Sequence, residues 1–166
     1  LMKILLIENY SIGHGGGIFL LASANINLQD STIAANMVGP GDVFGAGIYS
    51  DGGNVNLINS IVYYNRREGD SGINYNLNGN AADILDLYSV SYSNIESDEN
   101  WILEGLGNIS MDPEFVNFES NGDYALQEIS PCIDTGTDYF EYEGEIIVDM
   151  PDSSYYGQAP DMGAYE

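Results

Sequence analysis

The chain has 166 residues, of which 44% are hydrophobic, so it is long and apolar enough to form one domain with a core. Its 26 acidic side chains outnumber three basic ones, and the net charge of −23 opposes binding to nucleic acid or anionic lipid. No apolar run approaches the length of a membrane span. Two interpretations of the acidity stay open: a solvated surface that keeps the protein soluble in salt, or carboxylates that hold Ca²⁺.

The first nine residues, LMKILLIEN, are typical of a strand that is entered midway, without the features of a signal peptide. Their second half parallels IAAN at residues 33–36. We therefore expect the chain to be the last part of a longer, processed or truncated protein. The strand at residues 2–7 is expected to have an open edge that meets an upstream coil or another subunit, and end-to-end stacking would build a filament.

A repeat follows. NINLQDSTIAAN at residues 25–36 aligns without a gap to NVNLINSIVYYN at residues 54–65, an offset of 29. Upstream of each copy lies a second match, GGGIF ending at Phe19 and GAGIY ending at Tyr49. A weaker third unit is expected, with residues 72–75 as its glycine strand. Its later positions keep the same offset from the second copy, at Ile84, Ser89, Val90 and Asn94.

Short strands with this period, separated by turns rich in glycine and asparagine, predict an all-β parallel β-helix. The apolar positions Ile26, Val55 and Ile84 are expected to stack inward. Three asparagines at one corner are expected to form a hydrogen-bonded ladder, with a ligand-binding role as the alternative. These are Asn36, Asn65 and Asn94.

After residue 95 the repeat fades. The sequence predicts coils over residues 1–104, and a non-repeating, aromatic-rich region over residues 105–166 that caps the C-terminal end of the same domain. This region contains GNI, DPEFVN, NGDYALQ and SPCIDTG, and it closes with DMGAYE.

That series of motifs resembles the C-terminal portion of secreted bacterial proteins in the pectate-lyase-like superfamily, of the choice-of-anchor Q type. The resemblance implies a right-handed parallel β-helix located outside the cell or at its surface, and the general crossover rule favours the same hand. It does not specify an activity, because this superfamily includes lyases, glycosidases, tailspikes, adhesins and uncharacterised surface proteins. Residues 139–156 depart from the family pattern and are rich in acids.

Few residues have the spacing of a catalytic site. His14 lies among glycines, Cys132 is alone in an apolar run, and Arg66 and Arg67 follow a ladder position. A lyase needs Ca²⁺ and a base, and a hydrolase needs two facing carboxyls. The acids on the repeats show no matched pair: they are Asp30, Asp83 and Asp86. We therefore predict no catalysis in this segment.

Two weaker binding sites are predicted. Four acids near the Thr135–Thr137 turn and beyond it are candidate Ca²⁺ ligands, with a solvated acidic loop as the alternative. They are Asp134, Asp138, Asp149 and Asp152. Four tyrosines are candidates for an outward strip that stacks on sugar rings, with simple coverage of a sheet face as the alternative. They are Tyr63, Tyr64, Tyr88 and Tyr92.

From these observations we expect a structural, adhesive or assembly segment of an acidic extracellular protein. The alternative is a carbohydrate-binding or polysaccharide-degrading protein whose main site lies in upstream coils.

Overall fold

The computed structural model describes residues 2–41, 43–70, 75–80, 87–97, 105–118, 122–142 and 144–165. Within them the chain is all-β, apart from one short 3₁₀ turn, η2 (Asp152–Ser154). No helix in this part of the chain is long and apolar enough to cross a membrane.

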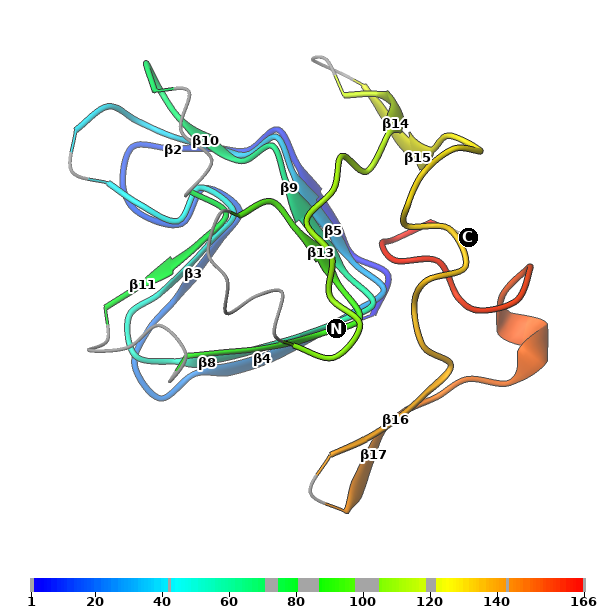
Figure 1. Ribbon diagram of the computed structural model, residues 1–166. Coiled ribbons are helices and arrows are strands. Elements are labelled where there is room, and N and C mark those ends of the chain that lie inside the picture. The colour runs from blue at the N-terminus through cyan, green and yellow to red at the C-terminus, as the bar shows by residue number, and fades with distance from the viewer. Residues whose placement is uncertain are drawn as a thin grey trace.

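The first 95 residues wind through the same four positions again and again (Figure 1). The first pass comprises β1 (Leu5–Ile7), β2 (Tyr10–Ser11), β3 (Ile18–Leu20) and β4 (Asn25–Gln29). The second pass comprises β5 (Thr32–Ala34), β6 (Met37–Val38), β7 (Ile48–Ser50) and β8 (Asn54–Ile58). The third pass comprises β9 (Ile61–Tyr63), β10 (Arg66–Arg67), β11 (Leu77–Gly79) and β12 (Tyr88–Ser91), and β13 (Asn94–Ile95) follows.

Equivalent strands of successive passes pair in parallel. The sheets have the orders β1-β5-β9-β13, β2-β6-β10, β3-β7-β11 and β4-β8-β12. This stacking of parallel sheets confirms the all-β prediction and is compatible with a β-helix. The pairing also follows the repeat, because Ile26 lies beside Val55 and Phe19 lies beside Tyr49. Ile84, the expected third member of the inward row, lies outside the described residues.

The third pass is longer than the sequence repeat predicts. Tyr88 pairs with Val55 and Asn94 pairs with Ile61, so the offset is 33 rather than the expected 29. The short third strand begins at Leu77, later than the expected residues 72–75, but it still lies 29 residues after its partner Ile48. The register expected for residues 84–94 was therefore wrong, because the chain between β11 and β12 is longer than the chain between β7 and β8.

Left-handed residues make one of the sharp corners between sheets. Asp30, Asn59 and Tyr92 occupy this corner in the three passes, with φ of 48°, 50° and 47°. Aspartate and asparagine tolerate this conformation better than most residues with a side chain. A single left-handed residue thus turns the chain from the long strand of each pass into the next short one.

The core lies inside the coils. Its fully buried residues include Leu28, Ile33, Val55, Leu57 and Val62. The sheet β1-β5-β9 also has an apolar outer face, which forms a second core cluster with residues of the C-terminal region. This cluster includes Ala34, Ile61, Phe115, Tyr124, Cys132 and Met162. A sheet that is apolar on both faces must be covered on both sides, which explains where the C-terminal region packs.

The C-terminal region contains two antiparallel hairpins. They are β14 (Phe115–Asn117) with β15 (Asp123–Leu126), and β16 (Tyr139–Tyr142) with β17 (Glu145–Asp149). Residues 106–109 bond to the last strands of the coils, through Tyr92 N to Leu106 O and Ile95 N to Ile109 O.

The remainder of the C-terminal region lies along the flank of the coils, as Figure 1 shows. There Tyr124 Oη donates to Glu8 in the first pass at 3.2 Å, and Ala164 N donates to Thr32 in the second pass at 3.0 Å. Residues 106–109 thus adjoin the last strands of the coils, whereas the hairpins cover a side of the domain, and a cap formed by residues 105–166 stays a prediction.

Candidate functional site

An asparagine ladder, buried except at its first member Asn9, runs along one corner of the coils. The amide oxygen of each member accepts hydrogen bonds from the backbone N–H and the side-chain N–H of the member before it. These bonds join Asn9 to Asn36, Asn36 to Asn65, and Asn65 to Asn76, at distances between 2.7 and 3.2 Å. Asn36 and Asn65 have the predicted role, and Asn9 and Asn76 extend the ladder at its two ends.

Asn94, the predicted third member, lies elsewhere. Its amide donates to Met111 O at 2.8 Å and to Cys132 Sγ at 3.0 Å. The extra length of the third pass moves it from the ladder corner into β13 beside Ile61. Asn76, which follows Asn65 closely in the chain, takes the ladder position instead.

Glycines in the repeated GGGIF and GAGIY segments make room for this ladder. A Cβ atom at Gly17 would approach Asn36 Nδ2 to 3.2 Å, and one at Gly47 would approach Asn65 Nδ2 to 3.0 Å. The two repeats in the sequence, glycine strand and asparagine corner, are therefore parts of one packing arrangement.

An ion pair ends the ladder. Arg66 contacts both carboxylate oxygens of Glu96 at 2.6 Å, and Asn76 donates to the same carboxylate at 3.2 Å. Glu96 is 7% exposed and also accepts from Tyr64 N at 2.8 Å. Arg66 is thus engaged in holding the third pass together.

A serine ladder was not predicted. Backbone N–H groups of Ser31 and Ser60 donate to the hydroxyl of the serine one pass later, Ser60 and Ser93. Each of these hydroxyls donates to the carbonyl two residues before it. The signal was present in the sequence, because Ser31 and Ser60 match in the repeat.

The structure does not bring the four candidate tyrosines together on one outward strip. Tyr88 is 5% exposed, and its hydroxyl donates to Asn78 O at 2.6 Å inside the coils. Tyr63 and Tyr64 lie on the flank under the C-terminal region, where Tyr64 stacks on Phe118 with 4.4 Å between ring centroids. Tyr92 lies apart from them at a corner, 6.1 Å from the ring of Phe140.

Ionisation of the half-buried Tyr63 phenol is expected to contribute to unfolding of the protein at high pH. Burial, followed by the carboxylates of Glu96 and Asp112, raises the pKa of Tyr63 to about 12. An unfolded tyrosine has a pKa of about 10, so the stability that the neutral phenol contributes is complete below about pH 10 and is lost as the pH rises towards 12. We expect Tyr63→Phe to raise the pH midpoint of unfolding, measured by circular dichroism. The matched variant Tyr156→Phe, at a side chain that is 83% exposed, should leave it unchanged. Equal midpoints in both variants would contradict this assignment.

The four candidate Ca²⁺ ligands are also dispersed. Asp134 accepts from Gln158 N at 2.7 Å, and Asp138 accepts from the Tyr155 hydroxyl at 3.1 Å. Asp149 and Asp152 are exposed, at the end of β17 and the start of η2. Among the described residues, no three His, Cys, Asp or Glu side chains form a group that could hold a metal ion. Binding of Ca²⁺ stays a prediction.

A groove forms between the outer face of sheet β4-β8-β12 and the hairpin β16–β17. Its main hollow has a volume of about 590 Å³. The floor presents amides and hydroxyls together with the apolar Ile58; the polar groups come from Asn25, Asn27, Asn54, Asn56, Ser89 and Ser91. The hairpin contributes an apolar wall, from Phe140, Tyr142 and Ile147. We call this hollow the asparagine groove.

The floor of the asparagine groove is regular because the strands below it are in register. Asn54 Nδ2 donates to Asn25 Oδ1 at 3.0 Å, and Asn56 Nδ2 donates to Asn27 Oδ1 at 2.7 Å. In register, Ser89 follows Asn56 in the third pass. Neighbouring strands lie about 4.8 Å apart, so the groove presents a row of polar groups at that spacing.

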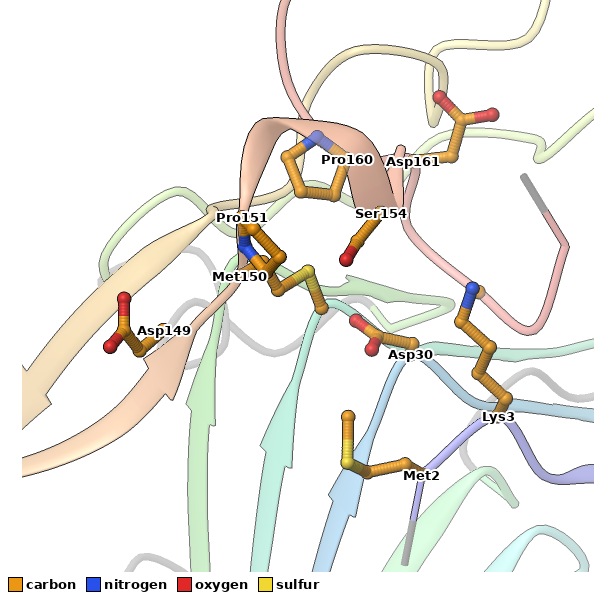
Figure 2. A pocket seen from close by; sticks show the side chains of 10 residues that line it. Met2, Lys3, Asp30, Asp149, Met150, Pro151, Ser154, Pro160 and Asp161 are labelled. Carbon is orange, nitrogen blue, oxygen red and sulfur yellow. The ribbon is translucent and has the colours of Figure 1, made fainter. Parts of the chain in front are cut away.

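Two smaller hollows continue the asparagine groove. The first, of about 180 Å³, shares Asn27, Asn56, Ile58 and Ile147 with it. The second, of about 310 Å³, shares Met2 with the first and is shown in Figure 2. Around this last hollow lie the two methionines Met2 and Met150, the Asp30 carboxylate and the Lys3 side chain, so its lining is both charged and apolar.

One buried side chain anchors the hairpin that forms the wall. Asn59 Oδ1 accepts from Thr137 N at 2.8 Å, and Asn59 Nδ2 donates to Thr137 O at 2.8 Å. The same amide donates to Asp30 Oδ1 at 3.1 Å. Asp134 N donates to Asp161 Oδ1 at 2.8 Å, which closes the base of the segment that carries the hairpin. Sequence reasoning missed Asn59, whose only signal was its place next to the repeated serine.

Comparison with known proteins found no match for the chain. The chain matches no protein-family model, and no curated protein or solved structure matches it significantly.

Proposed function

We propose that this protein is an adhesive module of an extracellular acidic protein and that it binds neutral carbohydrate in the asparagine groove. One observation carries the proposal: a floor of amides and hydroxyls faces an aromatic wall across a hollow with a volume of about 590 Å³. A sugar ring likewise has a polar edge, which carries its hydroxyls, and apolar faces, which carry its C–H groups. Amides bond the hydroxyls, and aromatic rings pack on the faces.

The charge of the protein favours a neutral ligand. The described lining of the asparagine groove contains no charged side chain, and the net charge of −23 would repel a uronate polymer. The same lining contains no pair of carboxyls of the kind that glycoside hydrolysis uses. The groups that are present are suited to holding a sugar, and for this reason binding is the activity proposed.

The proposal includes the fold class in its finer form, a right-handed parallel β-helix of the pectate-lyase-like type. The parallel pairing of successive passes and the asparagine ladder support the helix. The resemblance of the C-terminal motifs to secreted members of that superfamily supports the type and the extracellular location.

Replacing the wall tests the function. We expect Tyr142→Ala to weaken the binding of soluble neutral hexasaccharides, such as those of glucose, xylose and mannose, by about tenfold, because a stacked aromatic ring contributes about 0.5–1.5 kcal/mol beyond its buried area. Tyr142 is 57% exposed, so the change should not unfold the protein. The measurement is isothermal titration calorimetry.

The matched control is Tyr156→Ala, which removes an equally large and even more exposed ring outside the asparagine groove. It should bind like the unaltered protein. If no hexasaccharide binds the unaltered protein, or if both variants lose affinity equally, the proposed function is wrong.

A further inference from the structure

The hydrogen bonds on the floor of the asparagine groove leave acceptors available to a ligand. Asn54 and Asn56 of β8 both use their side-chain N–H groups to bond the first pass, at Asn25 Oδ1 and Asn27 Oδ1. Among the described residues, neither Asn54 Oδ1 nor Asn56 Oδ1 accepts a hydrogen bond. Both side chains are exposed and line the groove. The floor therefore presents two amide carbonyl oxygens that an N–H or O–H group of a ligand can bond.

An apolar spot interrupts this polar floor. Ile58 follows Asn54 and Asn56 at alternate positions of β8, so its side chain points to the same outer face of the sheet. Ile147 of the hairpin lines the same hollow from the side of the wall and is 39% exposed. We call Ile58 and Ile147 together the isoleucine patch. Asn56 and Ile58 are neighbours on one face, so the groove places an amide acceptor beside a small apolar contact.

We infer that the carbohydrate that binds in the asparagine groove carries acetamido groups, as polymers of N-acetylhexosamines do; this inference rests on the function proposed above. An acetamido group contains an N–H donor and a methyl group on the two sides of one planar amide. Its N–H group can donate to Asn56 Oδ1, and its methyl group can then pack on the isoleucine patch. One substituent thus uses both the polar and the apolar part of the floor.

The other common substituents of a sugar ring match this part of the groove less completely. A hydroxyl group can donate to Asn56, but it leaves the isoleucine patch in contact with water, and removing apolar surface from water is favourable. A carboxylate cannot donate to an amide oxygen, and the net charge of −23 repels it. An acetamido group is uncharged, in agreement with the described lining of the groove, which contains no charged side chain.

Calorimetric titration of the full chain with two matched ligands tests the inference. Chitohexaose, the hexasaccharide of N-acetylglucosamine, and cellohexaose, the hexasaccharide of glucose, have the same linkages and differ in the acetamido group. We expect chitohexaose to bind about tenfold more tightly, because its methyl groups bury apolar surface that a hydroxyl leaves exposed. Equal binding, tighter binding of cellohexaose, or binding of other neutral hexasaccharides alone would overturn the inference and leave the proposed function standing. If no hexasaccharide binds, both are wrong.

A substitution in the isoleucine patch tests the contact itself. Ile147→Ala should reduce the preference for chitohexaose over cellohexaose by about fivefold and leave the affinity for cellohexaose nearly unchanged. The matched control is Ile146→Ala, at a neighbouring side chain that is 58% exposed and does not line the groove. It should leave the preference unaltered. Tyr142→Ala should weaken both ligands alike, because ring faces are common to both. An equal effect of Ile147→Ala on the two ligands would refute the acetamido contact.

A spectroscopic measurement needs no variant. In saturation-transfer difference spectra of chitohexaose with the unaltered protein, the acetyl methyl protons should receive more saturation than the ring protons, because they lie against the isoleucine patch. Stronger saturation of the ring protons would contradict the assignment.

Discussion

Replacing Asn65 by alanine is expected to lower the free energy of unfolding by about 3–5 kcal/mol, because several buried groups lose their partners at once. Asn65 is fully buried and accepts two hydrogen bonds from Asn36, while its Nδ2 donates to Ile33 O and to Asn76 Oδ1. Alanine leaves donors of Asn36 and the carbonyl of Ile33 unsatisfied in the core. Urea unfolding followed by circular dichroism measures the change.

The control for this prediction is another asparagine of the stacked strands. Asn54 is exposed, and its side chain donates one bond, to Asn25 Oδ1. Asn54→Ala should lower the free energy of unfolding by less than about 0.5 kcal/mol, because water replaces the lost partner. If Asn65→Ala and Asn54→Ala destabilise the protein equally, the buried ladder does not have the role assigned to it.

Asn59→Ala is expected to release the hairpin β16–β17 from the coils. The substitution removes both hydrogen bonds to the backbone of Thr137 and the bond to Asp30. We expect the free energy of unfolding to fall by about 3–4 kcal/mol, because buried polar groups lose their hydrogen-bond partners. The amides of Gly136, Thr137 and Gly163 should exchange faster with solvent in hydrogen-exchange measurements. Because the hairpin forms the wall of the asparagine groove, the affinity for carbohydrate should fall together with the protection of these amides from exchange.

Asn59→Gly separates two contributions to that result. Asn59 has φ of 50°, a conformation that glycine adopts readily and alanine only at a cost of about 1 kcal/mol or more. The glycine variant should lose the same side-chain bonds but be more stable than the alanine variant by about that amount. Unchanged protection of Thr137 in both variants would show that another contact anchors the hairpin.

The correct sequence predictions share a physical cause. Residues 25–36 and 54–65 lie in register because equal spacing places equal side chains beside one another, and each matched pair contributes a contact or a hydrogen bond. Asn36 and Asn65 could be assigned to a ladder for the same reason. In a repeat, each segment indicates which other segment it pairs with.

Predictions that depended on loop length were less successful. Asn94 fits the period of the first two units, yet Asn76 is the residue that bonds Asn65. The local sequence of the third pass contains both asparagines and does not say which corner each will occupy. The partly buried ion pair of Arg66 and Glu96 joins residues far apart in the chain, and it had no local signal either.

The sequence by itself determined the all-β class, the stacking of the first two passes and the ladder of Asn36 on Asn65, because these are interactions between repeated segments. Only the tertiary structure decided that Tyr88 is buried, that the third pass is longer than the second, and that the hairpin β16–β17 faces the asparagines of β4 and β8. These features depend on loop length and on where a non-repeating tail packs. The apolar outer face of β1-β5-β9 attracts that tail, and the amide of Asn59 sets where its hairpin begins.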